Sequence, residues 1–326
     1  MKAIRVHEFG GPENMMHEDA PDPAPGEGEV LVRVKAAGVN PVDMAIRSGK
    51  HPASAMMSLP YIPGVDAAGV VEAAGPGVTG LKEGEKVYGR VAGGSYAELT
   101  RMAETEVSRV PDGFSFEDAA GVPIVFMTAW QALFNKADLQ AGETVLVQAG
   151  GGGVGTAAIQ LAKWKGAKIL TTVGSAEKAE RAKALGADHV ILYKESPFDE
   201  EVKRLTDEKG ADIIIETVAA DNLARDLSAL ALFGRIVLIG NGTGKGPDAT
   251  FPVGAALFRD LHLLSMTMFN AGPQVPGILK GLAEAFAGGE VRPQGGAAFP
   301  LKEAAAAHEA LLAGKFFGKV VLSPVE

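Results

Sequence analysis

Short apolar stretches separated by proline and glycine dominate the first third of the chain. Apolar residues that alternate with polar ones, together with β-branched residues, predict strands there. Clusters of proline, glycine and aspartate at residues 22–28 and 75–80 predict turns. The predicted strands cover residues 3–6, 29–36, 67–74, 86–90 and 95–100. Many short strands with turns between them are typical of an all-β, barrel-like region.

Helical patterning begins near residue 115 and marks the end of this β-rich region. Ser115 is a suitable N-cap, and Asp118 stands three residues later as a weaker capping-box partner. The helical period continues over residues 124–134, and residues 138–143 form the loop before the next strand.

A buried strand, a glycine-rich turn and a helix come next. Residues 145–148 are mostly apolar and β-favouring, as in a strand covered on both faces. The turn that follows has the spacing G-x-G-x-x-G and is formed by Gly150, Gly152, Gly153, Val154 and Gly155. Such a turn lets a pyrophosphate approach the backbone, and the unpaired amides of the helix bind the anion. The alternative is an ordinary tight strand-to-helix turn, which also uses glycines.

Beyond this turn, strands and helices alternate almost to the end of the chain. Strands are predicted at residues 168–173, 186–192, 211–216, 234–240, 261–268 and 319–322. Helices are predicted up to residue 185 and at residues 197–206, 222–231, 275–288 and 302–313. This alternation predicts an α/β fold with a doubly wound parallel sheet. The polar loop at residues 241–248 follows a strand at its carboxyl end, where ligands of such sheets bind.

Composition narrows the function classes. The 326 residues include 31 basic and 40 acidic side chains, and the resulting net charge of −9 argues against nucleic acid as a main partner. The absence of cysteine excludes disulfides, thiol nucleophiles and thiolate zinc sites. No apolar run reaches the roughly 20 residues that span a bilayer, and the N-terminus enters a strand pattern directly. We expect a cytoplasmic protein.

Four motifs in this order resemble one known family. They occupy residues 36–43, 63–71, 142–155 and 314–322. Nearly the whole chain resembles the zinc-independent quinone oxidoreductases, the zeta-crystallin-like branch of the medium-chain dehydrogenase/reductase superfamily. The resemblance implies a GroES-like, β-rich catalytic domain at residues 1–123 and 296–326 and a Rossmann domain at residues 124–295. It also implies hydride transfer from NADPH to a quinone or related conjugated carbonyl, and a homodimer.

The predicted coenzyme is NADPH because the end of the second Rossmann strand carries no carboxylate. An NAD enzyme places Asp or Glu there to hold the ribose 2′-hydroxyl, whereas this chain has Thr172 to Ser175. In the resembling family, matching residues surround the adenosine 2′-phosphate; here they are Gly174, Ser175, Lys178 and Tyr193. The alternative is that Lys178, beside Glu177, is only a solvated helix lysine. Further predicted coenzyme contacts are Val218, Gly240, Asn241 and Lys315.

The resemblance places Asn40, Asp43 and Thr128 near the nicotinamide as catalytic residues. Each has a simpler alternative: a turn residue before proline, a helix N-cap, and a threonine bonded to its own helix backbone. Zinc-dependent relatives have cysteine and histidine where this chain has Asn40 and Val65, neither of which can replace those ligands. We therefore predict no metal site.

Two other functions stay open as alternatives, one of them enzymatic and the other not. Many members of the family carry a tyrosine where this chain has Ala45, so an enone or enoyl-thioester reductase is one alternative. A non-catalytic crystallin or RNA-binding relative is the other, although the net charge and the intact glycine turn argue against it. The apolar strand at residues 261–268 is predicted to lie at a sheet edge and to pair across a two-fold axis in the dimer.

Overall fold

The computed structural model describes residues 1–91, 94–242, 246 and 248–324. It contains two compact units. The first comprises Met1–Ile124, Pro273–Ala283 and Pro293–Glu326, and the second comprises Val125–Gly272 and Glu284–Arg292. The first unit thus includes residues 273–283, which the predicted boundaries placed in the Rossmann domain.

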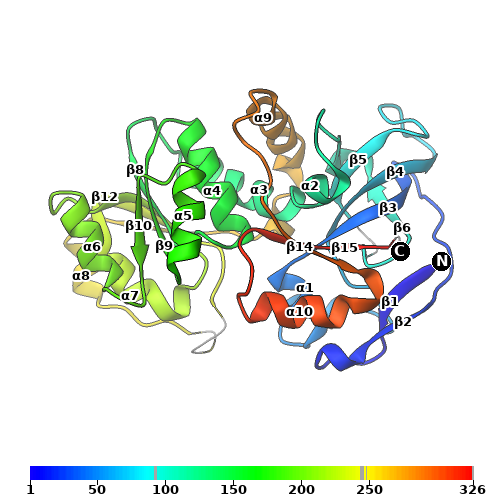
Figure 1. The fold of residues 1–326 in the computed structure, drawn as a ribbon, viewed down its shortest axis with the longest axis horizontal. Coiled ribbons are helices and arrows are strands. Elements are labelled where there is room, and N and C mark those ends of the chain that lie inside the picture. The colour runs from blue at the N-terminus through cyan, green and yellow to red at the C-terminus, as the bar shows by residue number, and fades with distance from the viewer. Residues whose placement is uncertain (92–93, 243–245, 247, 325–326) are drawn as a thin grey trace. The chain divides into compact units, whose positions relative to one another are not determined.

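The first unit is built on a seven-stranded sheet with the order β14-β15-β3-β4-β5-β7, in which β6 also pairs with β3 (Figure 1). Its strands are β3 (Glu29–Val39), β4 (Asp66–Ala74), β5 (Lys86–Arg90), β6 (Leu99–Ala103), β7 (Val107–Arg109), β14 (Gly295–Pro300) and β15 (Lys319–Ser323). A separate two-stranded sheet contains β1 (Lys2–Val6) and β2 (Met15–Asp19). Because β15 pairs with β3, the C-terminal segment completes the N-terminal unit. Alternating valines of β3 and β15 supply much of its core.

Three helices belong entirely to the first unit: α1 (Pro41–Arg47), α2 (Phe116–Ala120) and α10 (Ala304–Leu312). The predicted capping box of α2 is confirmed. Asp118 N–H donates to the Ser115 hydroxyl at 3.0 Å, and the Asp118 carboxylate accepts from Ser115 N–H at 3.1 Å. Two further helices, α3 (Pro123–Trp130) and α9 (Val275–Ala287), span the division between the units.

The strand predicted at residues 95–100 is displaced, since β6 begins only at Leu99. The backbone of Tyr96 bonds to other segments: its carbonyl accepts from Ile4 N–H at 2.8 Å, and its N–H donates to the Pro63 carbonyl at 3.0 Å.

Three strands of the first unit were not predicted from the sequence. β2 is largely exposed, β14 is mostly half-buried and begins with glycine and alanine, and β7 has three residues, so none shows a clear apolar alternation.

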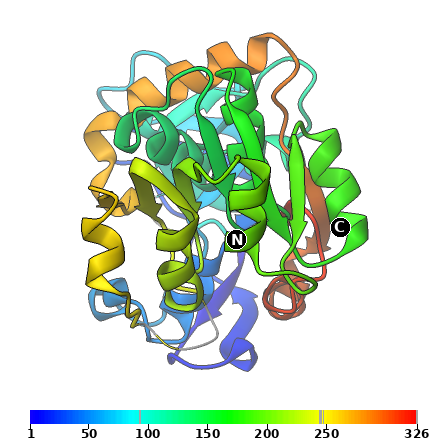
Figure 2. The same ribbon diagram turned by 90° about the vertical axis from the view of Figure 1, so that its left-hand side faces the viewer.

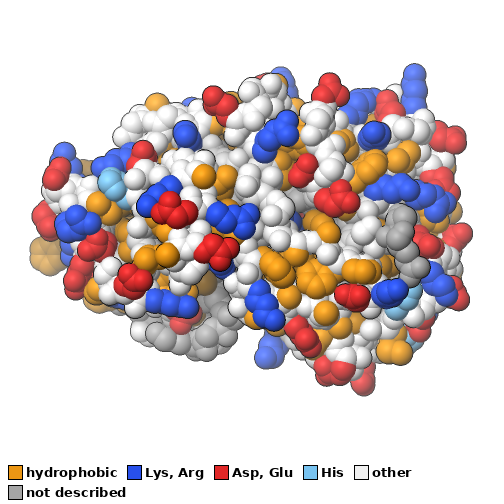
Figure 3. Space-filling view, in the orientation of Figure 1, with side chains coloured by type: hydrophobic (Ala, Val, Ile, Leu, Met, Phe, Trp, Pro, Cys, Tyr) orange, Lys and Arg blue, Asp and Glu red, His pale blue; other side chains and the backbone are white. Residues whose placement is uncertain are grey.

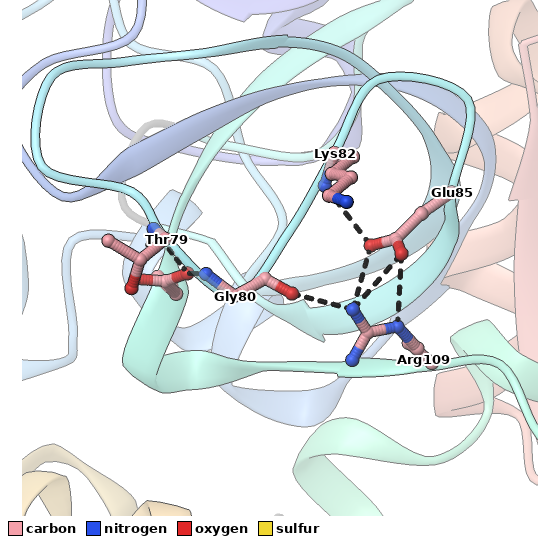
Figure 4. A network of polar contacts seen from close by, with 6 residues as sticks. Thr79, Gly80, Lys82, Glu85 and Arg109 are labelled. Atoms are coloured by element: carbon pink, nitrogen blue, oxygen red, sulfur yellow. Dashed lines mark hydrogen bonds and ion pairs between the residues drawn. The ribbon is translucent and has the colours of Figure 1, made fainter.

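A polar network fastens the loop between β4 and β5 (Figure 4). The Arg109 guanidinium donates to the Glu85 carboxylate at 3.0 Å and to the Gly80 carbonyl at 2.6 Å. The Glu104 carboxylate accepts from Thr79 N–H at 3.1 Å. These groups are solvent-exposed, so each pair stabilises the unit only modestly and serves to order the loop.

The second unit is a six-stranded parallel sheet with the order β10-β9-β8-β11-β12-β13. Its strands are β8 (Thr144–Val147), β9 (Lys168–Val173), β10 (His189–Leu192), β11 (Ala211–Glu216), β12 (Leu230–Leu238) and β13 (His262–Ser265). Its other helices are α4 (Gly153–Trp164), α5 (Ala176–Ala184), α6 (Phe198–Leu205), α7 (Ala219–Ala229) and α8 (Val253–Leu257). The strand order runs outward from β8 in both directions, and helices cover both faces of the sheet (Figures 1 and 2). The predicted doubly wound sheet is confirmed, with its switch point between β8 and β11.

Several predicted boundaries in the second unit are wrong by a few residues. β12 begins at Leu230 instead of residue 234, because the chain extends through a register shift and a left-handed Phe233 with φ of 59°. The helix predicted over residues 124–134 ends at Trp130 and continues as a π-helical turn, Gln131–Lys136. Half of the predicted loop 241–248 lies outside the described residues. Within the described part of the chain, no helix is long and apolar enough to cross a membrane.

Candidate functional site

The glycine turn between β8 and α4 is shaped by close packing. Ala149 has the left-handed φ of 54°. A Cβ on Gly150 would lie 1.9 Å from the Thr171 hydroxyl, and a Cβ on Gly155 would lie 2.3 Å from the Ala149 carbonyl oxygen. At Gly152 the nearest atom would be 3.4 Å away, so this position faces open space. Gly150 and Gly155 therefore let strand and helix approach each other, while Gly152 keeps the backbone accessible.

The N-terminus of α4 offers an anion site above this turn. Gly152 is the N-cap and makes no side-chain cap hydrogen bond. The amides of the first helical residues, Gly153, Val154 and Gly155, have no acceptor within a helix and carry the positive end of its dipole. This arrangement fits the pyrophosphate of a dinucleotide.

The carboxyl ends of β11 and β12 contribute a second segment beside the switch point. Val218 pairs with Asn241 through an isolated bridge. The same two segments are joined by hydrogen bonds from Ala219 N–H to the Gly240 carbonyl and from Ala220 N–H to the Asn241 carbonyl, both 3.1 Å long. Predicted coenzyme residues from two separate strands thus lie together in one stretch of paired backbone.

The end of β9 and the start of α5 bring together the four residues predicted around a 2′-phosphate. Ser175 is the N-cap of α5, and its hydroxyl accepts from Lys178 N–H at 3.4 Å. Tyr193 is half exposed, and a Cβ on Gly174 would lie 3.0 Å from its phenol oxygen. The Tyr193 phenol therefore lies against Gly174, and Ser175 joins this glycine to the first turn of α5, which carries Lys178.

Two further cations belong to this region and were missed from the sequence. Partial burial lowers the pKa of Lys178, Glu177 raises it, and the nearby positive charges of Lys194 and Arg181 lower it further. The sequence does contain a signal for these two cations, because Lys194 follows Tyr193 directly and Arg181 stands one helical turn after Lys178. The three positive charges of Lys178, Arg181 and Lys194 would attract an anion and stabilise it when it binds here.

Asn40 lies in a buried polar cluster of the first unit. Its side-chain amide donates to Asp66 Oδ1 at 3.0 Å, and its carbonyl oxygen accepts from the Lys319 ammonium. Lys319 also pairs with Asp66 Oδ2 at 3.5 Å, and that oxygen accepts from Ile124 N–H at 3.2 Å. Lys319 is buried, and its ammonium neutralises Asp66.

Asp43 lies at the third position of α1 and is not the N-cap, which is Asn40. Its Oδ2 accepts from Asn40 N–H at 2.8 Å and from the Tyr96 hydroxyl at 3.1 Å. Tyr96 in turn lies 2.9 Å from His308 Nε2. Burial and the charge of Asp66 raise the pKa of Asp43 to about 7, so this carboxyl is partly protonated near neutral pH.

The other predicted site residues lie elsewhere. Thr128 is buried in α3 of the second unit, whereas Asn40 and Asp43 belong to the first. Lys315 is exposed after the end of α10, in the first unit. The roles of all four toward a coenzyme or substrate stay predictions. No sequence signal pointed to Tyr96 or His308, because their pairing with Asp43 depends on the fold.

Comparisons with known proteins agree with both units. Residues 26–112 match the family described as alcohol dehydrogenase GroES-like domain, and residues 153–284 match the family described as zinc-binding dehydrogenase. The quinone oxidoreductase of Rattus norvegicus is 38% identical over 99% of this chain and 97% of its own length.

Solved structures show the same two-domain fold. A mycobacterial protein complexed with NADPH has a TM-score of 0.92 and 35% identity, with 99% of this chain and all of that chain covered. A structure described as an NAD-dependent alcohol dehydrogenase has a TM-score of 0.89 and 37% identity, covering 99% of each chain. The chain therefore belongs to the quinone oxidoreductase family of the medium-chain dehydrogenase/reductase superfamily and is an oxidoreductase.

Proposed function

We propose that this oxidoreductase transfers a hydride from NADPH to a quinone or a related conjugated carbonyl compound. The observation that carries the choice of coenzyme is the cationic region at the start of α5, formed by Lys178, Arg181 and Lys194. No carboxylate stands at the end of β9, where an NAD enzyme binds the ribose 2′-hydroxyl. A 2′-phosphate there gains cations and the hydroxyls of Ser175 and Tyr193 as donors.

The relatives support NADPH without being unanimous. The mycobacterial structure was solved with NADPH, whereas another similar structure is described as NAD-dependent. The preference must therefore be measured on this chain. When bound, NADPH supplies the hydride, and the amides of Gly153 to Gly155 hold its pyrophosphate.

Lys178→Glu tests the coenzyme assignment. A charge-assisted hydrogen bond contributes about 1.5–3 kcal/mol, so KM for NADPH should rise about 10- to 100-fold while KM for NADH changes little. Lys209→Glu, which alters an exposed lysine elsewhere in the same unit, is the matched control and should leave both constants near those of the wild type. An unchanged ratio of NADPH to NADH preference in Lys178→Glu would contradict the assignment.

Asn40, Asp43 and Thr128 remain the residues proposed to act near the nicotinamide. Two-electron reduction of a quinone consumes one proton besides the hydride. Asp43 suits this role chemically, because its raised pKa of about 7 keeps the carboxyl partly protonated at neutral pH. The buried network around Asn40 gives the N-terminus of α1 a single geometry.

We further propose that the reaction needs no zinc. At the two positions compared with zinc-dependent relatives, Val65 has no donor atom and both polar atoms of Asn40 are bonded within the protein. Within the described residues, no three His, Cys, Asp or Glu side chains are grouped as metal ligands. Elemental analysis that found one zinc per chain would overturn this part of the proposal.

The substrate class is tested by NADPH oxidation against matched panels of quinones, enones and enoyl thioesters. Rapid turnover of simple quinones would support the proposal. Turnover restricted to enones or thioesters, with quinones inert, would favour the alkene reductase alternative.

The surface charge argues against nucleic acid as a partner. Acidic and basic side chains are interspersed on the face shown in Figure 3, as is typical of a solvated enzyme surface and not of a basic nucleic-acid site.

The proposed partner is a second copy of this chain. β13 is the edge strand of the second unit's sheet, and its Leu263 is 44% exposed. Close to it in sequence, Leu257 and Phe258 of the α8 segment are 71% and 88% exposed. An unpaired strand edge beside exposed apolar side chains favours pairing with another sheet edge. A cytoplasmic location stays a prediction made from the sequence.

A further inference from the structure

Two carboxyl groups are buried together below the glycine turn. Glu216 ends β11 and Asp226 lies on α7, and both side chains are 0% exposed. Asp226 Oδ1 accepts from the Gln148 side-chain amide at 2.9 Å. Asp226 Oδ2 has no hydrogen-bond donor among the described groups, and the charge of Glu216 acts on this carboxyl and raises its pKa. A buried carboxyl oxygen without a donor, in the field of a second buried carboxylate, favours a protonated state in which the two groups carry one proton between them.

A chain of hydrogen bonds joins this pair to the glycine turn. Gln148 Oε1 accepts from the Thr172 hydroxyl at 2.7 Å, and that hydroxyl accepts from Ala149 N–H at 3.1 Å. The Thr172 carbonyl accepts from Gly150 N–H at 2.9 Å. Asp226 therefore supports, through two side chains, the left-handed residue on which the turn depends.

A second set of bonds joins the pair to the other proposed coenzyme segment. The Glu216 carboxylate accepts from Val218 N–H and, at 3.2 Å, from the Asn222 side-chain amide. The Glu216 carbonyl accepts from Ile239 N–H at 2.8 Å. Because Val218 pairs with Asn241, Glu216 holds the loops that follow β11 and β12.

We propose that Glu216 and Asp226 share a single proton and act as positioning residues, which hold the glycine turn and the Val218 loop in the geometry that binds the coenzyme. Loss of the shared proton then weakens coenzyme binding. This inference rests on the proposed NADPH site of the second unit.

The surroundings explain why the proton is retained. Burial raises the pKa of both groups, and the charge of Glu216 raises that of Asp226 further, while the Gln148 bond opposes the rise. The other charge facing Asp226 is Asp199 on α6, which is paired with Arg225 at 3.0 Å. The ordinary aspartate is ionised at neutral pH, so the folded protein holds one proton more than the unfolded chain. Raising the pH through the raised pKa leaves two buried negative charges and loosens both loops.

Asp226→Asn separates this role from simple packing. The amide keeps the bond from Gln148 and offers N–H donors toward Glu216, but it cannot ionise. We would measure the dissociation constant of NADPH by its fluorescence from about pH 7 to about pH 10. Affinity of the wild type should fall by up to about tenfold per pH unit relative to Asp226→Asn once the shared proton is lost. The titration of Lys178 occurs in both proteins and cancels in this ratio.

Glu200→Gln, which removes an exposed carboxylate from the same unit, is the matched control and should follow the wild-type curve. Glu216→Gln is the second variant: it also removes the like-charge pair, but its single oxygen can accept from only one of Val218 N–H and the Asn222 amide, so its affinity should be lower at every pH. Glu216→Gln should show the same flattened pH dependence, and it replaces Asp226→Asn in the comparison if that variant does not fold. Wild type and both variants with parallel curves would overturn the inference. Absence of NADPH binding by the wild type would instead overturn the proposed function.

Discussion

Gly155→Ala is the sharpest test of how the turn before α4 is built. The added Cβ would lie 2.3 Å from the Ala149 carbonyl oxygen and 2.7 Å from Gly150 Cα. Both are backbone atoms of the strand-to-helix turn, so no flexible side chain can move aside. Relief requires a shift of about 1 Å between α4 and the turn, since ordinary contacts of this kind are about 3.5–4 Å.

The expected cost follows from two opposing effects. Overpacking of a well-packed site costs about 1–3 kcal/mol or more, whereas alanine in place of glycine within a helix contributes about 1 kcal/mol. We expect a net loss of about 1–2 kcal/mol in the free energy of unfolding. Coenzyme affinity should fall as well, because the displaced turn no longer aligns the helix amides.

Urea unfolding, with and without NADPH, measures both effects. Gly152→Ala is the matched control, because its Cβ would meet nothing closer than 3.4 Å and its φ of −83° suits alanine. That variant should lose less than about 1 kcal/mol of stability, yet bind NADPH more weakly, because the methyl group occupies the approach of the pyrophosphate. Wild-type stability in Gly155→Ala would refute the packing argument, and wild-type affinity in Gly152→Ala would refute the placement of the pyrophosphate.

Three other outcomes follow from the structure. The stability of the wild type should fall by up to about 4 kcal/mol between about pH 4 and pH 7, because folded Asp43 keeps a proton that the unfolded chain loses; Asp43→Asn should abolish this slope in urea titrations. Lys319→Met should cost about 3–5 kcal/mol by leaving Asp66 buried without its cation, and adding Asp66→Asn should recover part of that loss. Phe258→Asp should shift the sedimenting mass from dimer to monomer, and a wild type that sediments as a monomer would contradict the proposed interface.

Local patterns in the sequence were sufficient for much of the fold. The apolar run before the glycine turn predicted a strand buried on both faces, and β8 is buried as expected. The Ser115 capping box was also predicted, and the parallel strand at residues 211–216 was predicted with its bounds. These features depend on residues within one or two turns of each other, so short-range chemistry is enough to specify them.

Weak local signals led to the errors. The strands β2, β7 and β14 show no clear apolar alternation, so they form because a neighbouring strand offers hydrogen bonds. The predicted start of β12 at residue 234 is wrong for a similar reason. The strand begins at Leu230, and its first residues pair with β11 across a register shift that no pattern within the segment reveals.

The polar interiors of both units were decided by tertiary structure alone. Lys319 and Asn40 are 279 residues apart, Tyr96 and His308 are 212 apart, and Gln148 and Asp226 are 78 apart. Each side chain read by itself is an ordinary surface or core residue. A buried polar group is tolerated only when a partner satisfies it, and the partner is supplied by whichever strand or helix the completed sheet brings beside it. The sequence by itself therefore determined most of the helices and strands and the glycine turn, whereas the tertiary structure determined the weakly patterned strands and which charged groups are buried.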